Sequence, residues 1–380
     1  MVQRGVHCVD HQIAVMSEGR LGRQSCRAGE ASYAMKITVQ SKSGVAEFEA
    51  DGSDNLLYEG LKRGLGLPYE CATGTCGTCR ARIMEGNVSL SWDDAPGMAY
   101  VKRAKNEVLL CQAHAHSDCI VRVPAKVEPL AEPCLPATRT GRIDTVQRLT
   151  HDVLHFEVAL DQQMSFAAGQ FAAITCADVA GARAYSMVNH ADSTDRLAFV
   201  VKRKPGGKFC DWLFETNVVG KQLSLMGPLG RATFRPEEGK NFVCIAGGSG
   251  IAGMMAITQH AMRDGYLKRH RGHIFFGVRT MDDCFYTAQF ADLVRGADGN
   301  LEVTIALSHE EPPQATHPVH PQIRLSSGFV HEVAAREMAG RYDNMVGFVA
   351  GPPPMVDGAL RMLIMEARLP AEFIRYDKFG

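Results

Sequence analysis

The sequence predicts a multidomain chain: a cysteine-rich first domain, then an antiparallel β-barrel, then an α/β domain with a parallel sheet. Three observations support this prediction. Three cysteines, Cys71, Cys76 and Cys79, follow the spacing C-x4-C-x2-C. Three prolines fall close together in residues 128–138, which suits an interdomain linker. From Asn241 onward, apolar strand-like runs alternate with helical stretches, as in an open α/β sheet.

The composition narrows the classes of function. The chain has 380 residues, of which 46% are hydrophobic, and a formal net charge of −1. This length is sufficient for two or three domains. The balanced charge argues against a general nucleic-acid binder, which carries a basic excess. Because no apolar run approaches the roughly 18 to 20 residues that a membrane-spanning helix needs, we expect neither a nucleic acid nor a membrane as partner.

Residues 1–34 show neither a clear periodicity nor the apolar core of a secretory signal. An alternating run over residues 35–41 reads as the first β-strand. We therefore expect residues 1–34 to be a flexible extension or the product of an upstream start codon. In the second case, Met35 is the natural first residue.

The twelve cysteines could suggest disulfides, but their placement argues against them. Outside the tight pattern, cysteines such as Cys176, Cys210, Cys244 and Cys284 lie singly among apolar or small residues. Such isolated cysteines are usual for reduced thiols in the cytoplasm, where we therefore place the protein.

We expect domains over residues 35–127, 138–237 and 238–380, with residues 128–137 as the linker. Short β-like runs between glycines and prolines predict the barrel, at 142–145, 153–159, 171–176, 197–202 and 222–226. Longer apolar strands predict the parallel sheet, at 242–246, 273–276, 301–306 and 345–350.

The cysteine pattern predicts an iron–sulfur site. With Cys111 downstream, it has the spacing of plant-type [2Fe–2S] ferredoxins. Four thiolates must converge on two irons, and Gly74 and Gly77 permit the tight turns that this convergence requires. A zinc site is the alternative, but zinc prefers two separated C-x2–4-C pairs and only one such pair can be drawn here. Cys119, eight residues after Cys111, competes as the fourth ligand, but Cys111 follows an apolar strand-like run, and we therefore expect Cys119 to be structural.

Residues 35–127 resemble plant-type ferredoxin domains. The resemblance implies a β-grasp (α+β) fold, with the cluster held by Cys71, Cys76, Cys79 and Cys111. The segments Pro-Tyr-Glu-Cys at 68–71 and Trp-Asp-Asp-Ala-Pro-Gly at 92–97 look particularly like those in the reductases of toluene and related diiron monooxygenases.

A flavin site is indicated by Arg183, Tyr185 and Ser186, which form the pattern R-x-Y-S after a strand. Alone this match is weak, since a solvated arginine and a packed tyrosine would look the same. However, the turn Pro-Gly-Gly-Lys-Phe at 205–209 leads into a helical stretch whose free N–H groups can face a phosphate. Together with Gly-Pro-Leu-Gly at 227–230, these residues resemble the flavin domain of the ferredoxin–NADP reductase superfamily.

This resemblance implies FAD rather than FMN, because the ferredoxin domain comes first. It implies that Arg183 binds the flavin phosphates, that Tyr185 packs on the isoalloxazine and that Ser186 hydrogen-bonds near its N5. The residues implied at the pyrophosphate are Gly206, Gly207, Phe209 and Cys210, the last standing where the family usually has Ser or Thr.

A dinucleotide site is indicated where the strand at 242–246 runs into Gly247, Gly248, Ser249 and Gly250 and then a helix. The glycines permit close approach of a pyrophosphate, and the helix N-terminus supplies partial positive charge. The segment resembles G-G-[ST]-G-I-A-P of the same superfamily, with Gly253 in place of the proline. A purely structural glycine turn is the alternative.

The resemblance implies two further segments at this site. Gly277 and Arg279 would flank the adenosine, while Gly351 and Pro352 would lie at the nicotinamide. Ala350 stands where the family has a cysteine, a departure that could slow hydride transfer.

Two features near the chain's end bear on the same site. Glu310 and Glu311 follow the strand at 301–306 and would repel the 2′-phosphate of NADPH, unless both simply face water. With the family resemblance, they favour NADH. Phe379 is the candidate aromatic covering the flavin, or else ordinary core.

The resemblance as a whole implies an NADH-dependent oxidoreductase that uses FAD and a [2Fe–2S] cluster, with Tyr185, Ser186 and Phe379 at the reacting centre. We expect a monomer whose partner is an oxygenase hydroxylase component or its small ferredoxin. A diiron aromatic or alkene monooxygenase is the first expectation, and a Rieske ring-hydroxylating dioxygenase is the alternative. A reductase of deoxysugar biosynthesis is a further alternative. A non-enzymatic redox sensor is the last, although no DNA-binding or signalling segment is found in the sequence.

Overall fold

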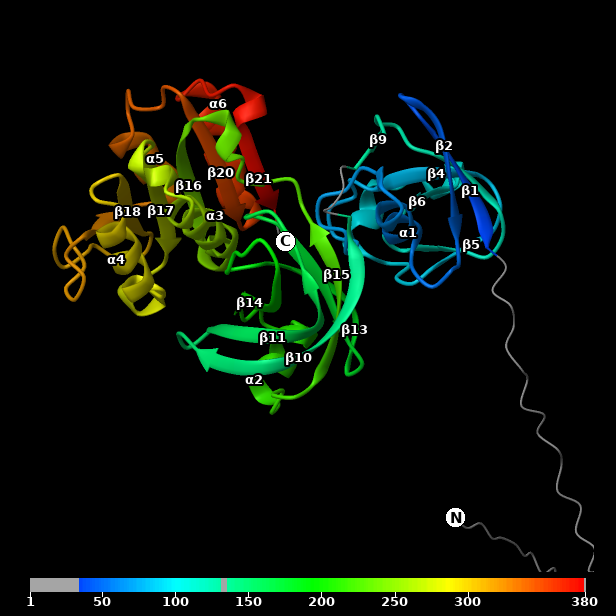
Figure 1. Cartoon of the computed structure of the whole chain (residues 1–380), viewed down its shortest axis with the longest axis horizontal. Helices are drawn as coiled ribbons and strands as arrows, with labels where there is room; N and C mark the ends of the chain where they lie inside the picture. Colours follow the sequence, from blue (N-terminus) through cyan, green and yellow to red (C-terminus); the bar gives the residue numbers. More distant parts are fainter. Residues whose placement is uncertain (1–33, 131–134, 379–380) are drawn as a thin grey trace, which may run out of the picture. The chain divides into compact units, whose positions relative to one another are not determined.

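The computed structural model describes residues 34–130 and 135–378, and each of the three regions builds its own principal sheet (Figure 1). Of the expected N-terminal extension only Ala34 is described, and Phe379 also lies outside the described residues. None of the helices in the described ranges is long and apolar enough to cross a bilayer.

The first region folds around a five-stranded mixed sheet with the order β2-β1-β8-β4-β6. Along β1, Ile37 and Val39 are buried, whereas Lys36, Thr38 and Gln40 alternate with them on the other face. Helix α1 packs on the apolar side, and Asn55 caps it by accepting a hydrogen bond from the Tyr58 amide at 3.0 Å. The predicted α+β fold is confirmed. The elements are β1 (Met35–Ser41), β2 (Gly44–Ala50), α1 (Leu56–Lys62), β3 (Leu65–Gly66), β4 (Arg80–Glu85), β5 (Val88–Leu90), η1 (Pro96–Tyr100), η2 (Arg103–Lys105), β6 (Glu107–Leu109), β7 (Ala113–Ala115), β8 (Cys119–Arg122) and β9 (Glu128–Pro129).

The segment expected to be a linker is partly paired. Its first two residues, Glu128–Pro129, form β9 against β3, and Ala137 already begins the next strand. Proline lacks an N–H donor, which limits how far such pairing can extend.

The second region is an antiparallel barrel of six strands with the order β13-β12-β15-β10-β11-β14. A single bridge between Met187 and Phe199 joins the end of β13 to β14. The barrel prediction is confirmed, but β13 was not among the predicted strands because it is rich in alanine and glycine, which are depleted in strands. The elements are β10 (Ala137–Arg148), β11 (Val153–Met164), β12 (Phe171–Cys176), β13 (Val179–Ser186), β14 (Thr194–Lys202), α2 (Lys208–Glu215) and β15 (Gln222–Leu229).

The third region is a parallel sheet, as predicted, with six strands in the order β19-β18-β17-β16-β20-β21. The two edge strands, β19 and β21, were not among the predicted strands. Residues of α3 and α4 share one core with Cys244 and Ala246, whereas residues of α5 and α6 share the other with Val243 and Ile245. Both faces of the sheet are therefore covered, as expected for parallel strands. The elements are β16 (Asn241–Gly247), η4 (Gly248–Gly250), α3 (Ile251–Arg263), β17 (Gly272–Val278), η6 (Met281–Asp283), α4 (Thr287–Gly296), β18 (Leu301–Leu307), β19 (Ile323–Ser327), α5 (Val330–Glu337), β20 (Met345–Gly351), α6 (Pro353–Met365) and β21 (Ile374–Lys378).

Candidate functional site

The four predicted cluster cysteines carry free thiols and lie around one loop. The sulfurs of Cys79 and Cys111 are 3.3 Å apart. The amides of Thr73 and Thr75 donate to the Cys71 sulfur at 3.4 and 3.3 Å. Further donors reach the loop's other sulfurs, from the Thr78 amide to Cys76 at 3.5 Å and from the Gln112 side chain to Cys111 at 3.6 Å.

N–H groups directed at cysteine sulfurs stabilise thiolates and tune an iron–sulfur cluster, so these residues fit such a group. A hydrogen bond from Cys76, aided by those from Thr75 and Thr73, lowers the pKa of Cys71 against the opposing effect of burial. The same pairing raises the pKa of Cys76, and the hydrogen bond with Cys111 together with burial raises that of Cys79.

The loop is held in a strained, compact path. Ala72, Gly74 and Gly77 have φ values of 57°, 94° and 78°, a left-handed region that costs glycine least. The Tyr58 hydroxyl of α1 donates to the Ala72 carbonyl at 3.0 Å. Gly97 donates its amide to the Gly74 carbonyl at 2.8 Å, and a Cβ at Gly97 would lie 2.8 Å from that oxygen. The segment 92–97 thus packs directly on the cluster loop.

Cys119 does not join this group. It is buried in β8, and its sulfur lies 3.2 Å from the Ser117 carbonyl and 3.8 Å from that of Asn87. Of the two candidates for fourth ligand, Cys111 is therefore the one whose sulfur contacts another predicted ligand.

The predicted flavin residues come from β13 and from the start of α2. Arg183 donates only to the neighbouring Ala182 carbonyl and has no carboxylate partner among the described residues, which leaves its charge for an anion. The ring of Tyr185 lies 5.6 Å from that of Phe209. Burial and the adjacent Cys210 thiol raise the pKa of Tyr185, so it is a neutral phenol.

The start of α2 suits a phosphate. Gly207 is its N-cap, no side chain caps the helix, and Gly206 has φ 72° with no atom within 4 Å of an added Cβ. Ser186 ends β13 and is buried. These features fit a flavin nucleotide, with the phosphate end at α2 and the ring end near Ser186.

The cluster loop contacts the flavin domain. The amide of Gly230, just after β15, donates to the Tyr69 hydroxyl at 3.0 Å. Arg231 reaches the Leu67 carbonyl at 3.5 Å. Tyr69 lies only two residues before the predicted ligand Cys71. Its hydrogen bond with Gly230 therefore connects the cluster loop to the barrel.

The predicted dinucleotide residues meet at the carboxyl edge of the parallel sheet. Gly247 pairs with Gly277, and Ala246 pairs with Ala350, next to Gly351 and Pro352. A Cβ at Gly250 would lie 2.3 Å from the Ala350 carbonyl, so the glycine turn can pack there only without a side chain. Ser249 lies within this turn, η4, which leads directly into α3. In open α/β sheets this edge is where ligands bind.

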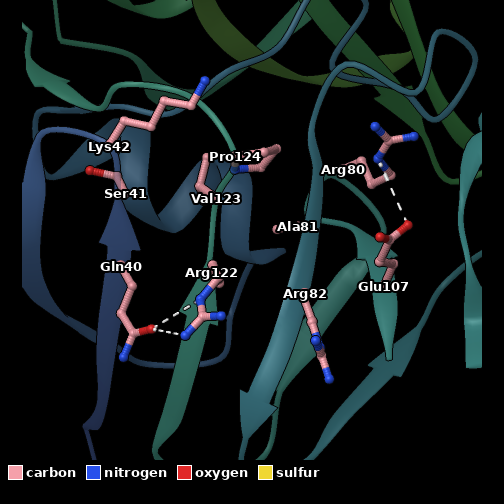
Figure 2. Close-up of a pocket in the computed structure, with 10 residues that line it drawn as sticks. All are labelled: Gln40, Ser41, Lys42, Arg80, Ala81, Arg82, Glu107, Arg122, Val123 and Pro124. Carbon is pink, nitrogen blue, oxygen red and sulfur yellow. Dashed lines mark hydrogen bonds and ion pairs between the residues drawn. The ribbon is translucent and has the colours of Figure 1, made fainter. Parts of the chain in front are cut away.

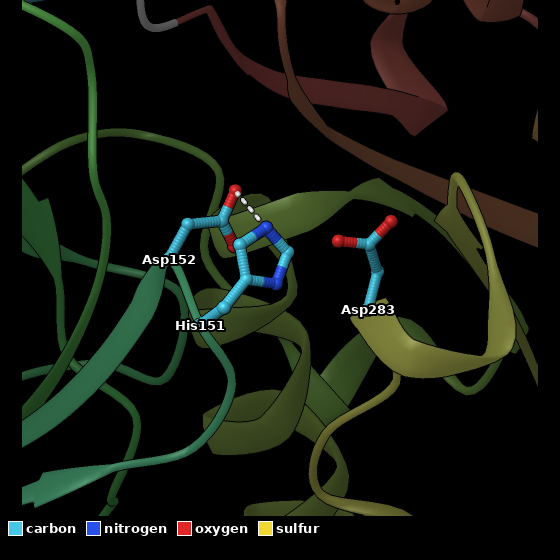
Figure 3. A group of neighbouring side chains, drawn as sticks. All are labelled: His151, Asp152 and Asp283. Carbon is cyan, nitrogen blue, oxygen red and sulfur yellow. Dashed lines mark ion pairs between the residues drawn. The ribbon is translucent and has the colours of Figure 1, made fainter.

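Arg279, after β17, is already paired. It lies 3.2 Å from Asp152 and 3.3 Å from Asp283, and Lys202 lies 2.9 Å from Asp152. Figure 3 shows the two aspartates together with His151. Burial would raise the pKa of Asp283, but its hydrogen bond and charge interaction with Arg279 lower it. His151 lies beside the two aspartates in a group that could in geometry hold a metal ion. Since both carboxylates are neutralised by side-chain cations, we interpret the group as an ion-pair network.

Sequence reasoning missed this network, together with a hydrogen bond of 2.7 Å between His155 and the Tyr286 hydroxyl. Asp152, His155 and Lys202 come from the barrel, whereas Arg279, Asp283 and Tyr286 come from the α/β domain. No local pattern marks residues that meet only across two domains.

Comparison with protein-family models finds three successive matches. Residues 38–116 match the 2Fe-2S iron–sulfur cluster binding domain, residues 140–234 the oxidoreductase FAD-binding domain, and residues 244–361 the oxidoreductase NAD-binding domain. The three matches follow the order of cofactors expected from the sequence.

Relatives match over nearly their whole length. Ferredoxin–NAD(P)+ reductase CarAd of Metapseudomonas resinovorans is 35% identical over 91% of this chain and 99% of its own. The ferredoxin–NAD+ reductase component of the alkene monooxygenase system of Xanthobacter autotrophicus is 32% identical over 87% of this chain and 97% of its own. A solved structure of the ferredoxin reductase in carbazole 1,9a-dioxygenase superposes with a TM-score of 0.77 at 31% identity, covering 92% of this chain and 99% of that one.

Proposed function

Because this chain belongs to the family of ferredoxin–NAD(P)+ reductase components of oxygenase systems, we propose that it oxidises NADH and delivers the electrons singly to an oxygenase partner. The observation that carries this proposal is the cysteine loop at 71–79, which meets Cys111 through Cys79 and is joined to the barrel by the hydrogen bond between Tyr69 and Gly230. When bound, the cofactors supply hydride transfer from nicotinamide to flavin and one-electron transfer through the cluster.

The protein's own contribution is to bind, orient and tune. Cys71, Cys76, Cys79 and Cys111 would ligate the irons. Arg183 and the start of α2 would hold the FAD phosphates, while Tyr185 and Ser186 would position the isoalloxazine. The dinucleotide would bind at the carboxyl edge of the parallel sheet. The residues there are Gly247, Gly248, Ser249, Gly250, Gly277, Arg279, Gly351 and Pro352. Phe379 remains a proposal from the resemblance alone, because it lies outside the described residues.

We propose NADH rather than NADPH as the coenzyme. Glu310 follows β18 and accepts a hydrogen bond of 2.5 Å from the Met281 amide, which holds a carboxylate beside the segment that contains Arg279. Arg279 itself is engaged by Asp152 and Asp283. Both features disfavour an additional 2′-phosphate.

For the partner, we propose a diiron monooxygenase acting on an aromatic or alkene substrate, because the segment 92–97 packs on the cluster loop and resembles that of such reductases. A Rieske ring-hydroxylating dioxygenase is the second candidate, supported by the 31% identity to the ferredoxin reductase in carbazole 1,9a-dioxygenase. In either case, the partner component is the hydroxylase or its small ferredoxin. We also propose that the protein is monomeric and cytoplasmic; the free thiols among the described cysteines support the second part, a reducing compartment.

The test is an anaerobic titration of the purified holoprotein with NADH, and separately with NADPH, followed by absorbance. Both flavin and iron–sulfur bands should bleach with about three electrons per molecule, two for the flavin and one for the cluster. NADPH should act poorly. If only the flavin bleached, the cluster would lie outside the electron path and the proposal would fail.

A further inference from the structure

A groove of about 670 Å³ lies on the polar face of the ferredoxin-domain sheet (Figure 2). It runs across β1, β8, β4 and β6. Four of the lining side chains are basic, and Glu107 is the one acidic residue among them. The basic residues are Lys42, Arg80, Arg82 and Arg122. This concentration of positive charge contrasts with the chain's net charge of −1.

Most of this charge is uncompensated. Arg82 and Arg122 are direct cross-strand partners of β4 and β8, an arrangement in which like charges destabilise a sheet. Arg122 donates to the Gln40 side-chain oxygen at 3.1 Å, which is a neutral acceptor (Figure 2). Among the described residues, no carboxylate lies within ion-pair distance of Arg82, Arg122 or Lys42. The repulsion between Arg82 and Arg122 lowers stability and is not offset by a carboxylate of the described residues. An external anionic group that binds this face would offset it.

The groove begins next to the cluster ligands. Arg80 follows Cys79 directly, and its side chain donates to the Tyr100 carbonyl at 2.6 Å. The Tyr100 ring is 60% exposed although it lies against the cluster loop, where a Cβ at Gly77 would meet it at 2.7 Å. The segment 102–105, which contains η2, adds the exposed cations Lys102, Arg103 and Lys105, of which Arg103 lies 3.9 Å from Asp93. An aromatic at the rim of a basic face is a common composition for a protein interface.

We infer that this groove, with Tyr100 at its rim, is the docking surface for an acidic electron-acceptor protein. The inference rests on the proposed function and adds the chemistry of the partner's surface. Charge complementarity would steer the acceptor to the part of the molecule nearest the cluster. A small anion does not need so broad a face, and the near-neutral chain lacks the general basic excess of a nucleic-acid binder.

The test uses the full-length holoprotein with three acceptors: cytochrome b5, which is acidic around its haem, basic cytochrome c, and ferricyanide. The variants are Arg82→Glu and Arg122→Glu, with Arg82→Gln and Arg122→Gln as milder substitutions. Lys268→Glu, an exposed residue of the α/β domain, makes the same change in net charge far from the groove in sequence. Binding of oxidised cytochrome b5 to oxidised reductase is measured alongside turnover.

We expect the second-order rate with cytochrome b5 to fall on the order of tenfold in each charge-reversal variant, with a matching loss of binding. In the wild type it should fall as ionic strength rises from about 0.01 to 0.15 M, where the screening length shrinks from about 30 to 8 Å. Lys268→Glu should behave as the wild type, and cytochrome c should not share the salt dependence.

Each contrary result has a distinct meaning. Loss of NADH-driven ferricyanide reduction in the wild type would overturn the proposed function, and the docking inference with it. Ferricyanide turnover with a cytochrome b5 rate and affinity insensitive to Arg82 and Arg122 would overturn the docking inference alone. Tighter, arginine-dependent binding of a DNA duplex would reassign the groove to nucleic acid. If a glutamate variant lost its cluster absorbance, the binding and the rate of the Arg82→Gln and Arg122→Gln variants with cytochrome b5 would be measured in its place. An affinity and a rate equal to those of the wild type would then overturn the docking inference.

Discussion

At the scale of single residues, the choice between Cys111 and Cys119 shows how environment assigns a role to a thiol. Both are buried, but Cys111 follows the apolar pair Leu109–Leu110, whereas Cys119 follows Asp118. Cys111 meets the Cys79 sulfur and receives a hydrogen bond from Gln112, whereas Cys119 meets only backbone carbonyls. A ligand needs converging sulfurs, while an isolated buried cysteine behaves as a small apolar residue.

Replacement of Cys111 by alanine should therefore abolish the iron–sulfur absorbance and leave the flavin bound, because only three thiolates would remain. The measurement is iron content and visible absorbance of the purified variant. Cys119→Ala is the matched control and should keep the cluster at a cost of about 1 kcal/mol in stability. Loss of the cluster in Cys119→Ala with retention in Cys111→Ala would reverse the assignment.

At the scale of elements, the start of α3 combines an unsatisfied helix N-terminus with a turn that only glycine can form. Four consecutive small residues, Gly247–Gly250, carry the chain from β16 into the helix. The added Cβ at Gly250 would overlap the Ala350 carbonyl at the end of β20. The end of β16, the end of β20 and the start of α3 can therefore pack together only because Gly250 has no side chain.

We predict that Gly250→Ala weakens NADH binding. The turn must shift to relieve the clash between the added Cβ and the Ala350 carbonyl. We expect this shift to cost about 1–3 kcal/mol of binding free energy, which corresponds to a rise in KM on the order of tenfold. Steady-state ferricyanide reduction at varied NADH measures the effect. Gly253→Ala, one turn later, is the steric comparison, since its Cβ would approach no atom closer than 3.6 Å. An unchanged KM in Gly250→Ala would show that the turn does not carry the dinucleotide.

At the scale of the whole molecule, the barrel and the α/β domain are joined by polar and aromatic contacts. His190, after β13, stacks on His260 of α3 with ring centroids 4.3 Å apart and reaches the Phe166 carbonyl at 3.1 Å. Arg263 of α3 pairs with Asp192 at 2.8 Å. Burial, with the charges of His260 and Arg263, lowers the pKa of His190 to about 4.

This lowered pKa predicts acid sensitivity of the junction. Between pH 6.5 and about 4, the unfolded chain binds a proton at His190 that the folded chain does not, so stability is lost as the pH falls through this range. His190→Gln keeps a donor for the Phe166 carbonyl but does not titrate, so its thermal midpoint should fall less over the same range. The control is His309→Gln, at an exposed histidine. Equal pH profiles for the wild type and His190→Gln would contradict the prediction.

Local patterns in the sequence were sufficient for the three cofactor-binding domains and for most of their strands. The spacing of Cys71, Cys76 and Cys79, and the glycine turn after the strand at 242–246, express chemistry that must lie within a few residues. Strands such as β12 and β18 were recognised because short apolar runs that contain β-branched residues favour a strand in the sequence alone. Alanine- and glycine-rich β13 was not, because its strand conformation is imposed by its neighbours.

Only the tertiary structure decided which distant residues meet. The pairing of Arg82 with Arg122 depends on the register of β4 against β8, and the contacts of Arg279 with Asp152 depend on packing across two domains. By itself the sequence determined the three cofactor modules and their order, because each module has a short local motif: C-x4-C-x2-C, R-x-Y-S and the turn Gly247–Gly250. The basic groove and the ion-pair network arise from long-range packing, which no local spacing encodes.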